Sequence, residues 1–118
     1  MTLPILIRRL ITETALDLAD IDMPGESGVA AGGFDGVTDA GAATPHVPQG
    51  VSVWELSVGG NDAKANDDYA KRTSGPGGTR ARDCTYVEVI LSPWTKARTW
   101  AGEKSKLRRW REVRAYKP

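Results

Sequence analysis

Hydrophobic residues recur with a helical period at the start of the chain. The first apolar stripe consists of Leu3, Leu6, Ile7, Leu10 and Ile11. These positions lie on one face of a helix with 3.6 residues per turn. We expect that helix to continue to about Leu18, because Pro24 and Gly25 then break the pattern.

Later in the chain, β-branched and aromatic residues favour strands that are separated by helical and glycine-rich segments. The predicted strands are 34–40, 51–58, 84–91 and 112–116. Helices are predicted for about 61–72 and for a basic stretch at 96–110, which Gly102 interrupts. The resulting order is α-β-β-α-β-α-β, which predicts an α/β domain with a mixed sheet and helices on both faces.

Length and composition favour a single domain over residues 1–118, with 40% hydrophobic and 26% charged residues. No apolar run approaches the roughly 20 residues of a membrane span, so no membrane contact is expected. The single cysteine, Cys84, rules out an intramolecular disulfide and fits the cytoplasm, and we expect it to be a core residue. The final predicted strand ends abruptly, which suggests a fragment or N-terminal domain of a longer protein with further C-terminal domains or subunits.

Charge is distributed very unevenly, although the net charge is only +1. Residues 1–70 carry three cations against eleven anions, whereas residues 96–118 carry nine cations against two anions. A basic segment of this kind suggests a polyanionic partner such as DNA. The alternative is that the two halves neutralise each other. The candidate nucleic-acid-binding residues are Arg80, Arg82, Lys106, Arg108, Arg109 and Arg111.

Two acidic residues lie where the predicted strands should be apolar. Glu55 shares a strand face with Val51 and Val53, and Asp35 lies between glycines on the neighbouring predicted strand. A carboxylate in such a place is costly unless it is paired or bound to a cation. The pair would therefore suit Mg²⁺ or Mn²⁺, with Asp39 as a third member. The alternative is that Asp35 is a turn residue and Glu55 lies on an exposed face.

The helix that follows Glu55 carries Lys64, Asp68 and Lys71 on one face. A metal acting on a phosphodiester also needs a cation that stabilises developing negative charge, and either lysine could supply it. A solvated helix with internal ion pairs is the alternative.

Together, these segments resemble the PD-(D/E)XK nuclease superfamily, and within it the Mrr-like nuclease domains of large bacterial proteins. The resemblance is carried by segments 6–11, 33–36, 52–55, 68–73 and 113–116. It implies the restriction-endonuclease-like fold and a Mg²⁺- or Mn²⁺-dependent deoxyribonuclease active in defence against phage or foreign DNA. Asp35 and Glu55 would be its metal ligands and Glu13 a helper.

The chain departs from that superfamily at one position. The superfamily pattern has a lysine two residues after the second acid, and here that position, two residues after Glu55, is Ser57. We favour migration of the lysine to the helix, to Lys71 rather than Lys64. The alternatives are a catalytically inactive nuclease-fold module that binds nucleic acid or protein, and a structural sensing module of a larger assembly. Assembly into a homo-oligomer stays open.

Two weaker signals involve aromatic and imidazole side chains. Trp94, Trp100 and Trp110 alternate with cations and could stack on bases, but packing of the last helix against the sheet is the favoured interpretation. His46 lies between prolines in a loop, and we expect no catalytic role for it.

Overall fold

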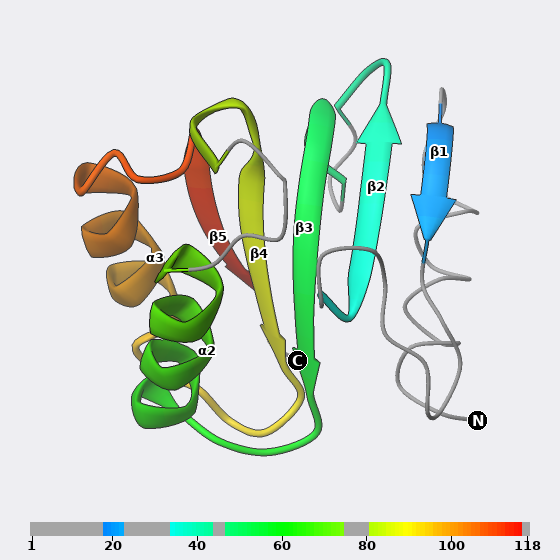
Figure 1. Ribbon diagram of the computed structural model, residues 1–118. Coiled ribbons are helices and arrows are strands. Elements are labelled where there is room, and N and C mark those ends of the chain that lie inside the picture. The colour runs from blue at the N-terminus through cyan, green and yellow to red at the C-terminus, as the bar shows by residue number, and fades with distance from the viewer. Residues whose placement is uncertain (1–17, 23–33, 44–46, 75–80, 117–118) are drawn as a thin grey trace.

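A computed structural model of the protein describes residues 18–22, 34–43, 47–74 and 81–116 (Figure 1). Five strands form one mixed sheet, in the order β1-β2-β3-β4-β5. The strands are β1 (Leu18–Asp22), β2 (Gly36–Ala40), β3 (Gly50–Ser57), β4 (Thr85–Ile90) and β5 (Glu112–Tyr116). The helices are α2 (Asp62–Ser74) and α3 (Ala97–Lys106), and a 3₁₀ turn, η2 (Ala81–Asp83), precedes β4. The predicted α/β class is confirmed.

Strand direction changes across the sheet. The pairs β1–β2 and β2–β3 are antiparallel, whereas the pairs β3–β4 and β4–β5 are parallel. Parallel neighbours need a crossover, and α2 and α3 provide the two crossovers. β4 lies between two parallel strands, and each of its residues is buried, as expected for the most apolar segment of the chain.

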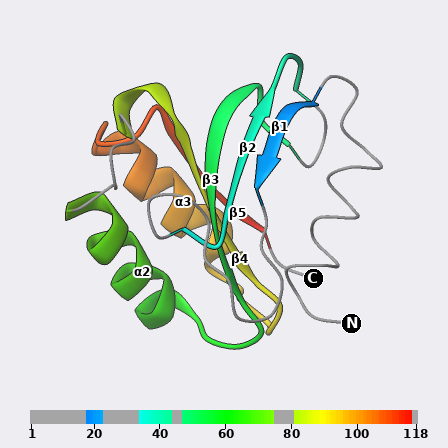
Figure 2. The same ribbon diagram turned by 45° about the vertical axis from the view of Figure 1, so that its right-hand side comes forward.

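Both described helices pack on the same face of the sheet, as Figures 1 and 2 show from two directions. The prediction of helices on both faces is not tested by α2 and α3 alone, which share one face. The physical reason is that β3, β4 and β5 follow one another in a single direction, so two right-handed crossovers must lie on one side. The helix predicted at the start of the chain lies outside the described residues.

The core between the helices and the sheet is rich in aromatic side chains. Its members include Phe34, Tyr69 and Tyr86 together with Trp94, Trp100 and Trp110, all of them buried. Packing of the three tryptophans is thus confirmed. Cys84 belongs to the same cluster, as predicted, and burial raises the pKa of its thiol.

Three tryptophan side chains connect α2 to the rest of the domain by hydrogen bonds. The indole N–H of Trp94 donates to Asp62, that of Trp100 to Asn66 at 2.9 Å, and that of Trp110 to Thr73 at 2.9 Å. The acceptors are spread from the first turn of α2 to its last. The helix is therefore held along its whole length by polar contacts as well as by apolar packing.

The opposite face of the sheet has its own smaller core. Ala40, Val47, Trp54, Val87 and Val89 form this cluster. The Trp54 indole N–H donates to Thr38 Oγ1 at 3.0 Å, so its one polar atom is satisfied inside the sheet.

Element boundaries differ from the predictions mainly at β1 and α3. β1 begins where the N-terminal helix was expected to end, and it pairs with β2 through an irregular register between Leu18 and Asp20. The basic helix ends at Lys106 rather than 110 and passes through Gly102 without a break. Arg108 then adopts a positive φ of 55°, which turns the chain toward β5. No described helix is long and apolar enough to cross a membrane.

We expect the α2–α3 interface to dominate stability. Trp100→Ala should lower the free energy of unfolding by about 3–5 kcal/mol, because it empties a large buried site. Trp100→Phe should cost about 1–3 kcal/mol, since it keeps much of the ring but leaves Asn66 without its donor. Urea denaturation measures both, with exposed Thr99→Ala as the control. A loss below 1 kcal/mol for Trp100→Ala would contradict this assignment.

Candidate active site

The parallel register of β3 and β4 places two glutamates side by side. Glu55 is the partner of Glu88, and both lie on the face that α2 covers. Only 5% of Glu55 and none of Glu88 is exposed. Two carboxylates this close in an apolar environment cannot both remain charged without compensation.

Asp35 is fixed beside Glu55 by the backbone of β3. Its N–H donates to the Trp54 carbonyl at 3.0 Å, and its Oδ2 accepts the Leu56 N–H at 2.8 Å. The pKa of Glu55 is raised to about 8, first by burial and then by the hydrogen bond with Asp35. Glu55 therefore keeps its proton to a higher pH than an exposed glutamate does.

Arg72 is the cation that contacts Glu55. Its Nε donates to Glu55 Oε1, and its guanidinium lies 5.8 Å from the centroid of the Phe34 ring. The arginine lowers the pKa of Glu55 but does not outweigh burial and Asp35. It compensates part of the acidic charge rather than all of it.

Glu88 is linked to α2 through a second acid. Its Oε1 accepts the Tyr86 hydroxyl at 2.9 Å, whereas its Oε2 has no fixed donor. The pKa of Glu88 is raised to about 10 by burial and by the neighbouring Asp68. Asp68 in turn accepts from Lys64 Nζ at 2.8 Å. The proton on Glu88 thus faces an ion pair at the surface of α2.

The structure brings together only some of the predicted catalytic residues. Asp35 and Glu55 meet as expected, so the alternative of an exposed Glu55 is wrong. Lys64 lies near the pair and bonds to Asp68. Lys71 lies on the exposed side of α2, because Ala65, Asp68, Tyr69 and Arg72 form the face turned to the sheet.

Two other predicted positions lie apart from the pair. Asp39 is opposite Val51, four residues before Glu55, which corresponds to about 13 Å along the strand. Ser57 hydrogen-bonds to the backbone of Gly59 and completes the turn after β3. Glu13 lies outside the described residues, as does His46. Asp39 is therefore no third ligand of the pair.

Sequence reasoning missed Glu88, Arg72 and Tyr86. Glu88 interrupts an apolar strand in the same way as Glu55, so the signal that singled out Glu55 applied equally to it. Arg72 had no such signal, because its role depends on the rotation of α2 about its axis. Among the described residues, no group of three or more His, Cys, Asp or Glu side chains is arranged to hold a metal ion.

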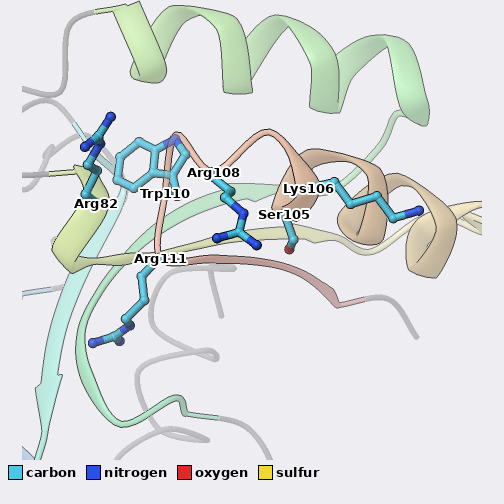
Figure 3. A pocket seen from close by; sticks show the side chains of 6 residues that line it. All are labelled: Arg82, Ser105, Lys106, Arg108, Trp110 and Arg111. Carbon is cyan, nitrogen blue, oxygen red and sulfur yellow. The ribbon is translucent and has the colours of Figure 1, made fainter.

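Basic residues gather around Trp110, whose indole N–H donates to Thr73 in the last turn of α2. We use the name basic hollow for a surface depression of about 690 Å³ lined by Arg82, Ser105, Lys106, Arg108, Trp110 and Arg111 (Figure 3). Four of the six predicted nucleic-acid-binding residues line it. Arg109 is exposed on the same loop but does not line the hollow. Arg80 lies outside the described residues.

Comparisons of the chain with protein-family models, curated proteins and solved structures find no match. The resemblance to PD-(D/E)XK nucleases therefore stands on the short sequence segments that suggested it.

The raised pKa of Glu88 predicts how stability depends on pH. Between about pH 4.5 and 10 the native state holds a proton that the unfolded state releases, so stability falls as pH rises through this window. Glu88→Gln keeps the shape, accepts from Tyr86 and donates to Asp68 without titrating. Its advantage over the parent should grow by up to about 1.4 kcal/mol per pH unit.

Urea denaturation between pH 5 and 9 measures this difference. Glu103→Gln, an exposed change on α3, is the control and should show no growing advantage. Parallel curves for the parent and Glu88→Gln would contradict the buried proton.

Proposed function

We propose that this protein is a metal-dependent nuclease domain of the PD-(D/E)XK type, similar to Mrr-like domains, which hydrolyses DNA phosphodiester bonds. Its proposed role is that of an effector in bacterial defence against phage or foreign DNA. The observation that carries the proposal is the Asp35–Glu55 pair: an acid directly before β2 and an acid in β3 lie together beside the Arg72 cation.

The chemistry of the pair fits Mg²⁺ or Mn²⁺. Carboxylate oxygens are the ligands that these hard cations prefer. The raised pKa of Glu55 reflects an uncompensated demand for positive charge, which a divalent cation would meet by displacing the proton of Glu55. Asp35 and Glu55 would hold the ion, which when bound supplies an activated water and neutralises phosphate charge.

Arg72 is the best placed side chain to stabilise the charge that develops on the phosphate. It already contacts Glu55, and 20% of its side chain is exposed, so it can reach an incoming phosphate. A planar guanidinium offers several donors to phosphate oxygens. Lys64, with 46% of its side chain exposed, is the second candidate. Lys71, the lysine favoured by the resemblance, has no contact with the acids.

A second function is supported by the same arginine. Because Arg72 already pairs with Glu55, the acid has a partner without any metal, and Ser57 replaces the usual lysine. Both observations favour a nuclease-fold module that binds nucleic acid without cutting it.

Cleavage of plasmid DNA separates the two functions. The parent should nick or linearise the plasmid with Mg²⁺ or Mn²⁺ and leave it intact with EDTA. Asp35→Asn and Glu55→Gln should each reduce the rate at least about 100-fold, because each removes a charged ligand. Exposed Asp67→Asn on α2 is the matched control and should retain the parental rate. An intact plasmid with the parent and both metals, under conditions where DNA still binds, would establish the inactive module.

Cation replacements on α2 test the assignment of Arg72. Arg72→Gln should slow cleavage about 100-fold, the loss typical of a removed charge-stabilising donor. Lys64→Gln should have an intermediate effect, and Lys71→Gln should stay within about twofold of the parent. Initial rates with supercoiled plasmid measure these differences, and thermal denaturation checks folding. A severe loss for Lys71→Gln with a normal rate for Arg72→Gln would restore Lys71 as the catalytic cation.

A further inference from the structure

The basic hollow has a backbone frame that is fixed by hydrogen bonds. The Arg111 N–H donates to the carbonyl of Cys84 at 2.9 Å and to that of Ala81 at 3.3 Å, which joins the loop before β5 to η2. Ser105 Oγ donates to the Val113 carbonyl and accepts its N–H, which joins the end of α3 to β5. The hollow is therefore preformed rather than assembled by a moving loop.

Arg111 is held in place by neutral partners alone. Its Nη2 donates to the Gln49 carbonyl at 2.6 Å and to Thr85 Oγ1 at 3.0 Å. The guanidinium lies against Gly50, where φ is +81° and a Cβ atom would stand 2.8 Å from Nη1. Glycine meets both requirements. No carboxylate takes part in these contacts, so they leave the positive charge of the guanidinium unneutralised.

The other cations of the hollow also lack acidic partners. Within the described ranges, Arg82, Lys106, Arg108 and Arg111 form no ion pair, and no carboxylate lines the hollow. The C-terminal end of α3 contributes about half a negative charge, which offsets only a fraction of these four. The hollow is thus strongly attractive to anions.

The shape of the hollow indicates which kind of anion fits. In the view of Figure 3, the Arg82 side chain extends upward and the Arg111 side chain downward, whereas Lys106 extends to the right, away from both. Charged groups that diverge in this way cannot all bind one phosphate, but they can bind successive phosphates along a nucleic-acid strand. Trp110 offers no face for a base, since it is 2% exposed and packs against Phe34 and Tyr86.

We propose that the basic hollow binds consecutive phosphates of a nucleic-acid backbone and reads no bases. This inference rests on the nucleic-acid part of the proposed function, but not on catalysis. The hollow also lies close to the acid pair through a short series of contacts. Trp110 packs on Phe34, the Phe34 ring lies under the Arg72 guanidinium, and Arg72 bonds to Glu55. A strand held in the hollow would therefore pass near the end of α2 that carries Arg72.

Fluorescence-anisotropy titrations in EDTA, which prevents cleavage, test the proposal with duplexes of two unrelated sequences. The test variant combines Arg82→Gln, Lys106→Gln and Arg108→Gln, and leaves Arg111 in its structural contacts. The matched control combines Lys71→Gln, Lys96→Gln and Arg98→Gln, three exposed cations outside the hollow. The test variant should weaken binding to both sequences equally and reduce the slope of log affinity against log salt by about 2.7. The control should keep nearly the parental slope.

Competition experiments identify the ligand. An unlabelled 12-nucleotide strand should displace the labelled duplex, whereas inorganic phosphate and a mononucleotide should fail at the same phosphate concentration. Equal displacement by a mononucleotide would overturn the proposal in favour of a single-phosphate site. Equal losses for the test and control variants would also overturn it, because binding would then depend on overall charge.

The two proposals fail in different ways. Binding through the hollow without cleavage in Mn²⁺ would remove the nuclease function and leave this inference intact. Cleavage by the parent with undiminished DNA binding by the test variant would support the nuclease function and contradict the inference about the hollow. A single Arg108→Gln variant, altered only at an exposed head, provides a folded reference if the triple variant loses stability.

Discussion

The neutralisation of Glu55 and Glu88 beneath α2 is the constraint on which the rest of the structure depends. Parallel pairing of β3 and β4 forces the two carboxylates together, and their burial makes an unshared negative charge there too costly. The charge is neutralised by protons and by two cations of α2. Arg72 bonds to Glu55, and Lys64 bonds to Asp68. Asp35 is the hydrogen-bond partner of Glu55, and Asp68 is that of Glu88. A small displacement of α2 would therefore disturb charge balance as well as packing.

The architecture supports this arrangement by placing α2 and α3 on one face. The two helices enclose the aromatic core, and the three indole hydrogen bonds fix the rotation of α2 about its own axis. That rotation decides which of two adjacent cations, Lys71 or Arg72, meets the acid. The tryptophans thus influence the polar site without touching it.

Much of the fold was predictable because β-branched content, glycine breaks and charge separate β3, α2, β4 and β5 clearly in the sequence. β1 was not, since Leu18–Asp22 has only one β-branched residue, and its strand conformation depends on pairing with β2. In the site, Asp35 and Glu55 were identifiable as acids in apolar surroundings. Arg72 was not identifiable. Neighbouring residues such as Lys71 and Arg72 point about 100° apart on a helix, and the local sequence does not determine which of them faces the sheet.

The indole contacts also govern the order in which the molecule can assemble. Each joins α2 to a residue 32 to 37 positions further along the chain. During synthesis, α2 can form its own turns early, but it cannot be fastened over β3 until the segment carrying Trp94 to Trp110 has emerged. Loop closure over such distances slows folding. The buried acids are therefore covered late, and water has access to them until the segment that carries Trp94 to Trp110 is in place.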